Sequence, residues 1–425
     1  MGRISLSTVR HPYMYRQKHH FTKPRLIGVI LSAALDLVGP DIPKATVLLA
    51  SIIPGLATKV VVPYIIHLFP YALRVIIFAA LSTCGMLTVA LSPSRDVGVK
   101  VVGILLANIS SGAGEVNFLA LTHFYGPCSL AAWGCGTGGA GLLGAGAYAL
   151  ATTTLGFSVQ ATLLASAVIP LGMLMSFFLL LPLCPLKADT RKELTLQSAA
   201  EQDDPETDGT GERAGLLDQP DAHAVSPAYV RHKSRLQRTV SELKTKLLRA
   251  RTLVVPYMIP LFLVYVAEYT LNQGVAPTLL FPLEQSPFKH FRAFYPTYGA
   301  IYQMGVFISR SSLPFIRIRS LYTPTILQVV NLVVLTVHAL WPFIPTVWLV
   351  FAVILWEGLL EGLVYVSTFA AIREEVPQEE REFSLGAATV SDSAGICVAG
   401  FLGVAMESLL CSWQVNHGRD WCRRL

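Results

Sequence analysis

Apolar residues in this chain gather in blocks of about 20 positions, separated by short polar joints. A helix of that length is what is needed to cross a hydrocarbon core of about 30 Å. The chain shows no series of alternating segments of about ten residues, which a transmembrane β-barrel would require. We therefore predict an all-α integral membrane protein that crosses the bilayer many times.

The blocks predict about eleven transmembrane helices. The first block is short and contains Asp36, so the first helix is expected to be shortened or atypical. The predicted helices cover residues 26–40, 45–69, 73–91, 97–121, 128–151, 158–183, 253–275, 297–316, 322–341, 346–370 and 385–410.

A long polar stretch, residues 187–250, separates the sixth block from the seventh. It is acidic first ("AAEQDDPETDGTGER"), with the composition of a disordered segment, and then basic. Lys and Arg next to a span favour the cytosolic side, so this loop is placed in the cytosol. The predicted parts of the chain are a basic cytosolic tail (1–25), an N-terminal transmembrane bundle (26–186), the loop (187–250), a C-terminal bundle (251–410) and a tail on the opposite side of the membrane (411–425).

The composition supports this class and excludes several others. Hydrophobic residues make up 53% of the chain and charged residues 14%, whereas about a quarter of a soluble domain is charged. The net charge of +6 comes mostly from flanks and loops, without the basic stripe interleaved with aromatics that nucleic-acid binding requires. The seven cysteines form no CxxC or metal-ligand pattern, so no metal or cofactor is predicted. An enzyme would need a nucleophile–base pair or metal ligands at fixed spacing, and the sequence offers neither.

Two pairs of blocks in the first and second halves of the chain resemble each other. The fourth and tenth blocks each carry a carboxylate, in "GAGEVNF" (Glu115) and "GLLEGLVYV" (Glu361). The fifth and eleventh share small residues at close spacing, in "CGTGGAGLLGAG" and "SDSAGICVAGFLG". Repeated halves are typical of major-facilitator-type transporters and predict two pseudo-repeated bundles. Close packing of small residues explains the glycines equally well, but not the paired carboxylates.

Ionisable and amide side chains stand inside several blocks. A carboxylate such as Glu115 near the bilayer centre costs roughly 2.5–3.5 kcal/mol on insertion scales. Such groups usually face the bundle interior or a watery cavity, and they often pair. Structural salt bridges are one interpretation, with Lys59 and Arg310 each neutralising one acid; a polar transport cavity is the other. The full set is Lys59, Glu115, Glu268, Asn272, Gln273, Arg310, Glu357, Glu361 and Asp392.

Six segments of the chain resemble the battenin family of lysosomal membrane proteins: "ISSGAGEVNFLALTHFY", "GTGGAGLLGA", "VYVAEYTLNQG", "GVFISRSSL", "WEGLLEGLVYVSTF" and "EEREFSLGAATVSDSAGI". The resemblance extends from about Val29 to Cys411. It implies an eleven-helix bundle related to the major facilitator and equilibrative nucleoside transporter groups, in the lysosomal and late endosomal membrane. It also implies export of glycerophosphodiesters, the deacylated remains of phospholipids, in support of lysosomal pH and lipid homeostasis. The chain departs from the family at its start, where "MYRQKHHFTKPRLIGVI" replaces an Asn-rich segment.

With a phosphodiester as substrate, the intramembrane set acquires roles. Arg310 is expected to bind the phosphate through two parallel hydrogen bonds. Asn272, Gln273 and a carboxylate can accept from glycerol hydroxyls. Glu115 is expected to hold Arg310 in the empty site, or to take a proton from an acidic lumen. The predicted substrate-binding residues are Glu115, Glu268, Asn272, Gln273, Arg310 and Glu357, with Lys59, Glu361 and Asp392 as a secondary intramembrane set.

Three further hypotheses concern segments outside the spans. "ERAGLL" places Glu212 ahead of the pair Leu216 and Leu217, an acidic dileucine that clathrin adaptors could bind. A non-transporting scaffold that recruits trafficking partners through residues 187–250 is the alternative function. Cys411 and Cys422 either form a disulfide on the side opposite the cytosol or remain two free thiols.

Overall fold

The computed structural model describes residues 44–66, 69–92, 97–126, 128–149, 158–182, 248 and 250–424. The chain divides into two compact units, Pro182–Leu253 and Met1–Leu181 with Val254–Leu425, and the helices of the bundle belong to the second of these. The first predicted span, 26–40, lies outside the described residues. So do most of the predicted 187–250 loop and the whole of its dileucine (Glu212, Leu216 and Leu217).

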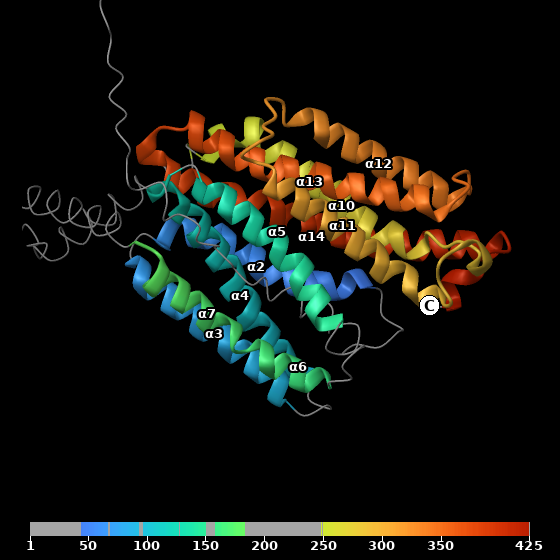
Figure 1. Ribbon diagram of the computed structural model, residues 1–425, viewed down its shortest axis with the longest axis horizontal. Helices are drawn as coiled ribbons and strands as arrows, with labels where there is room; N and C mark the ends of the chain where they lie inside the picture. Colours follow the sequence, from blue (N-terminus) through green and yellow to red (C-terminus); the bar gives the residue numbers. More distant parts are fainter. Residues whose placement is uncertain are drawn as a thin grey trace, which may run out of the picture. The chain divides into compact units, whose positions relative to one another are not determined.

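The described part of this unit is helical and follows the second to the eleventh predicted blocks (Figure 1). Its N-terminal half contains α2 (Lys44–Ile65), α3 (Tyr71–Leu91), α4 (Val97–Leu121), α5 (Cys128–Ala149), α6 (Val159–Ser166) and α7 (Ile169–Met175). Its C-terminal half contains η6 (Val254–Met258), α10 (Ile259–Thr270), η7 (Leu271–Val275), α11 (Phe294–Ser311), α12 (Tyr322–Leu340), α13 (Val347–Glu375) and α14 (Gln378–Asn416). Within the described residues, seven segments are long and apolar enough to cross a membrane, and Ser51–Ile65 of α2 is a shorter apolar helix.

The helices of the two halves pack in matching patterns. In the N-terminal half α4 packs on both α2 and α3, and in the C-terminal half α13 packs on both α11 and α12. Between the halves, α2 packs on α14 just as α11 packs on α5. The correspondence of α4 with α13 and of α5 with α14 is the one that the sequence echo predicted. The chain is thus a bundle of two pseudo-repeated halves.

Glycine lets the main chains approach closely where the helices cross. A Cβ atom on Gly358 of α13 would lie 2.3 Å from the carbonyl oxygen of Tyr302 on α11. Between the halves, a Cβ atom on Gly138 of α5 would lie 3.0 Å from Cα of Phe307 on α11. The packing interpretation of the glycine-rich block is therefore correct, because small residues allow backbones to meet.

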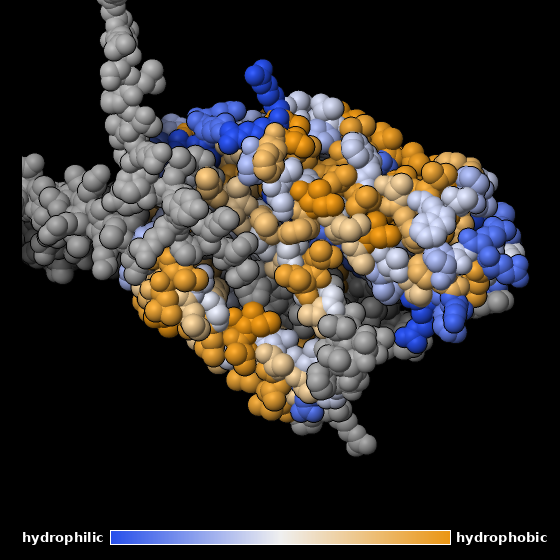
Figure 2. Space-filling view, viewed as in Figure 1, coloured by the Kyte–Doolittle hydropathy of each residue, from blue (hydrophilic) through white to orange (hydrophobic). Residues whose placement is uncertain are grey.

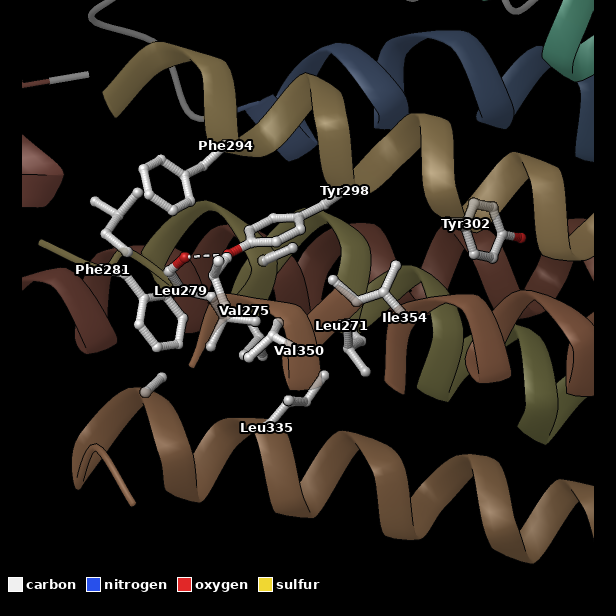
Figure 3. Packing of buried hydrophobic residues seen from close by; sticks show 14 of the residues in the cluster. Leu271, Val275, Leu279, Phe281, Phe294, Tyr298, Tyr302, Leu335, Val350 and Ile354 are labelled. Carbon is white, nitrogen blue, oxygen red and sulfur yellow. Dashed lines mark hydrogen bonds between the residues drawn. The ribbon is translucent and has the colours of Figure 1, made fainter. Parts of the chain in front are cut away.

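One large apolar core lies within the C-terminal half (Figure 3). Leu271 and Val275 of η7 pack there against Val350 and Ile354 of α13, with Leu335 of α12 closing one side. The buried hydroxyl group of Tyr298 donates a hydrogen bond to the carbonyl oxygen of Leu279, at 2.7 Å. This core fixes η7, α11, α12 and α13 relative to one another.

The outer faces of the helices expose apolar side chains. On α12, Ile326, Val330, Val333 and Val337 are all exposed and recur at the spacing of one helix face. In Figure 2 hydrophobic colour covers much of the sides of the bundle, while hydrophilic colour gathers mainly toward its two ends. An exposed apolar stripe of this kind is suited to lipid rather than water.

The C-terminal segment folds back on the end of the C-terminal half. Helix α14 continues to Asn416, beyond its predicted end at residue 410. Gly418 then reverses the chain with a φ of 81°, and Cys422 forms a disulfide with Cys411. Gln414 donates to the carbonyl oxygens of Thr278 and Ala339, at 3.0 and 2.8 Å. The tail thus joins the ends of α12 and α14 to the segment that follows α10.

Candidate functional site

Lys59 lies between two carboxylates from different helices. Its Nζ is 3.1 Å from Oε2 of Glu115 on α4 and 2.8 Å from Oδ1 of Asp392 on α14. All three side chains are buried. Lys59 and Glu115 belong to the N-terminal half and Asp392 to the C-terminal half, so this ion-pair triad joins the halves.

Arg310 near the end of α11 has a corresponding set of partners. Its Nη2 forms a buried ion pair with Glu361 of α13 and donates to the hydroxyl of Tyr265, at 3.0 Å. Tyr265 in turn donates to Oε1 of Glu361, at 2.6 Å. Across the boundary between the halves, Nη1 of Arg310 donates to Oγ1 of Thr137 on α5, at 3.2 Å.

The two basic residues occupy equivalent positions in the repeat. Lys59 of α2 pairs with an acid on α4, and Arg310 of α11 pairs with an acid on α13, within the same half each time. Each also reaches one polar group in the other half, on α14 and α5 respectively. The partners differ at this last position, where Lys59 meets the carboxylate of Asp392 and Arg310 meets the hydroxyl of Thr137.

Tyr365 of α13 connects the two sets. Its hydroxyl donates to Oε1 of Glu115, at 3.1 Å, and accepts from the indole Nε1 of Trp133, at 3.2 Å. The guanidinium of Arg310 lies 4.0 Å from the centre of its ring, in the geometry of a cation–π contact. Two side chains, Glu115 and Tyr365, therefore connect Lys59 to Arg310.

The remaining predicted residues form a neighbouring set around η7. Glu268 accepts from the hydroxyl of Tyr302, and Nδ2 of Asn272 donates to Oε1 of Glu357, at 3.2 Å. Oε1 of Gln273 accepts from Tyr295, at 3.1 Å. Asn272 and Gln273 lie in a π-helical turn, a feature frequent at functional sites.

The structure corrects one predicted contact. Glu115 was expected to hold Arg310, but the basic partner of Glu115 is Lys59, while the acidic partner of Arg310 is Glu361. Helix packing explains this, because α4 packs on α2 and α13 packs on α11. Lys59 and Glu361 of the secondary set therefore contact residues predicted as primary, and Asp392 contacts Lys59.

Sequence reasoning missed the aromatic and hydroxyl members of the site: Trp133, Thr137, Tyr265, Tyr302 and Tyr365. Helical spacing could have indicated two of them. Tyr365 follows Glu361 by four positions and Tyr265 precedes Glu268 by three, so each shares a helix face with a carboxylate.

A second polar layer joins the halves where α13 leads into α14. Arg74 at the start of α3 lies 3.6 Å from Glu382 of α14, which also accepts from the hydroxyl of Tyr71. Arg373 of α13 donates to Oγ of Ser129, at 3.1 Å, and to the carbonyl oxygen of Tyr125. The charge pattern of the sequence predicts that this end faces the cytosol.

The family model for the CLN3 protein matches residues 26–413 of this chain. The chain belongs to the CLN3 protein family. The expected resemblance to the battenin family is thereby confirmed, and the match spans nearly all the described helices.

Curated relatives agree over nearly their whole length. The chain is 56% identical over 407 residues to protein btn1 of Aspergillus fumigatus, covering 94% of this chain and 88% of that protein. Identity is 48% to protein BTN1 of Yarrowia lipolytica, covering 93% and 94%. A solved peptide transporter of the POT type aligns with 93% of this chain and 91% of its own, at 12% identity and a TM-score of 0.47. This TM-score is below the level at which a shared fold follows.

Proposed function

We propose that this membrane protein exports glycerophosphodiesters across the lysosomal or late endosomal membrane. The observation that carries the proposal is the pair of buried basic residues at equivalent positions of the two halves, Lys59 and Arg310, which are connected through Glu115 and Tyr365. Sites in transporters built from repeats lie near the bilayer midplane between the repeats.

The chemistry around Arg310 suits a phosphodiester. A guanidinium offers a planar fork of donors that matches two oxygens of a phosphate. Tyr265 and Thr137 already stand within hydrogen-bond distance of this fork. A bound phosphate would share Arg310 with Glu361, while Asn272 and Gln273 of η7 offer amide groups for glycerol hydroxyls.

The charge balance of the site favours transport over a purely structural role. Within the intramembrane set predicted from the sequence, five buried carboxylates accompany two buried cations: Glu115, Glu268, Glu357, Glu361 and Asp392 with Lys59 and Arg310. Bracing alone would need one acid for each base. The surplus carboxylates suit a transport site, because they can bind protons or the positively charged head group of a substrate.

The disulfide between Cys411 and Cys422 supports the proposed location. Disulfides persist in oxidising compartments and are rare in the cytosol. A tail that faces the lumen agrees with the charge pattern that predicts a cytosolic loop at residues 187–250.

Uptake of a labelled glycerophosphodiester into proteoliposomes tests the function directly. We expect saturable uptake by the unmodified chain and a strong loss of uptake in Arg310→Lys, because a single ammonium cannot replace the two-pronged contact. The matched control is Trp348→Phe, a conservative change at an exposed position of α13. Equal uptake by empty vesicles and by vesicles that contain correctly folded protein would leave the scaffold alternative as the better account.

A further inference from the structure

The two equivalent basic residues differ in the charge around them. Lys59 lies within 3.1 Å of two carboxylates, Glu115 and Asp392. At the position that Asp392 holds for Lys59, Arg310 meets the neutral hydroxyl of Thr137. With every group ionised, the contacts of Arg310 to Glu361 and Thr137 are balanced, whereas the Lys59 triad carries one surplus negative charge inside the bundle.

The surplus acid is also the group that joins the halves. The contact between Lys59 and Glu115 lies within the N-terminal half, while the contact between Lys59 and Asp392 crosses to the C-terminal half. Loss of the second contact would leave Lys59 paired with Glu115. Separation of the two halves at this contact therefore leaves the buried charge of Lys59 paired, which avoids the large cost of an unpaired buried charge.

We propose that Asp392 is a proton-binding site that couples the contact between the halves to pH. A proton from water binds a carboxylate oxygen of Asp392, its ion pair with Lys59 is lost, and α2 can part from α14 while Lys59 stays with Glu115. Release of the proton to water restores the pair. The proposal rests on the proposed transport function, to which it assigns a coupled ion.

The helices packed against α14 carry further polar groups of the site. Tyr265 of α10 lies within electrostatic range of Asp392, and Glu268 follows it on the same helix. Tyr365 of α13 reaches Glu115, and Glu361 stands one turn before it on α13. The backbone nitrogen of Ser393 donates to Oδ1 of Asp392, which favours the charged carboxylate in the paired state. The cation that faces Asp392 across the halves is Lys59, at 2.8 Å.

The seam between α2 and α14 supplies a direct readout. A Cβ atom on Gly386 of α14 would lie 3.9 Å from Cβ of Pro63 on α2, within the range of about 3.5–4.5 Å that disulfides prefer. The pair Pro63→Cys with Gly386→Cys should therefore crosslink when the seam is closed. This measurement needs no substrate, so its result is independent of whether glycerophosphodiesters are transported.

The experiment compares the crosslinking rate of this cysteine pair with and without Asp392→Asn, at neutral and at acidic pH. The ratio of the crosslinking rates with Asp392 and with Asp392→Asn is taken at each pH, because the pH dependence of thiol chemistry then cancels. At neutral pH the chain with Asp392 should crosslink about fivefold faster or more, and at acidic pH the two rates should become equal. Glu407→Gln, which removes a different carboxylate from α14, should leave the original ratio unchanged.

A ratio that is the same at both pH values overturns the proposal, as does an absence of crosslinking at neutral pH in the chain that retains Asp392.

A second readout avoids the introduced cysteines. In proteoliposomes with labelled glycerophosphocholine, Asp392→Asn should keep exchange of the probe between the two sides but lose accumulation driven by a pH gradient. Gradient-driven accumulation in Asp392→Asn contradicts the proposal, whereas failure of all proteins to move the probe contradicts the proposed function and leaves the crosslinking result standing.

Discussion

The ion pair between Arg310 and Glu361 permits the sharpest test of how the bundle handles charge. The side chains are 3% and 0% exposed, so solvent screens the pair very little. Glu361→Gln keeps the shape of the side chain and removes its charge, which leaves Arg310 buried against the neutral groups of Tyr265 and Thr137. Breaking a buried pair on one side costs about 3–5 kcal/mol. We expect a loss of that order in the free energy of unfolding.

Two further variants isolate the charge as the cause. Arg310→Met with Glu361→Gln removes both charges, and the amide introduced at position 361 can still accept from Tyr265; a buried pair replaced on both sides is often close to neutral in stability. The double variant should therefore recover at least about 2 kcal/mol relative to the sum of the single losses. Glu115→Gln is the matched comparison, because Lys59 retains Asp392 at 2.8 Å. It should lose much less, about 1 kcal/mol.

Unfolding of the purified protein in mixed micelles, titrated with a denaturing detergent, measures these differences. The same proteins in vesicles should show that the double variant folds but does not take up a glycerophosphodiester. Equal stability of Glu361→Gln and the unmodified chain would refute the assignment of a charged, buried pair. Simple additivity of the two single losses would refute the claim that the two side chains depend on each other.

Four further changes have definite expected outcomes. Cys411→Ser should lower the unfolding free energy by about 3 kcal/mol, as expected for a disulfide that closes a short loop. Cys397→Ser, at a free cysteine, should have little effect. Thermal melts with and without reductant check both expectations. Gly358→Ala should destabilise the protein by about 1–3 kcal/mol, because the new Cβ meets the carbonyl oxygen of Tyr302. Gly299→Ala, whose Cβ would have nothing within 4 Å, should be neutral or stabilising. A lower melting temperature for Gly299→Ala than for Gly358→Ala would contradict the close crossing of α11 and α13. Tyr365→Phe retains the ring beneath Arg310 but loses the hydrogen bonds to Glu115 and Trp133. Uptake per folded molecule should fall several-fold, and about 1 kcal/mol of stability should be lost. Unchanged uptake would argue against a link between the contacts of Lys59 and those of Arg310. Leu216→Ala with Leu217→Ala should send more protein to the cell surface, as surface labelling would detect, and an unchanged lysosomal fraction would argue against the dileucine signal.

Local properties of the sequence were sufficient to predict the helices. The length of an apolar block depends on neighbouring residues alone, so the blocks from 45–69 to 385–410 correspond to helices from α2 to α14. The intramembrane charges were equally visible, because an ionisable group such as Glu115 or Arg310 is conspicuous within an apolar run. The similarity between the blocks of Glu115 and Glu361 likewise indicates the repeat from the sequence alone.

Tertiary packing alone decided which charges meet. Lys59 and Asp392 are 333 positions apart in the chain, and their contact exists because α2 packs on α14. The predicted contact between Glu115 and Arg310 was wrong for the same reason. The positions of acids and bases in the sequence do not show which helices are neighbours. The role of Tyr365 is likewise decided by packing, because three helices bring Glu115, Trp133 and Arg310 to this one side chain.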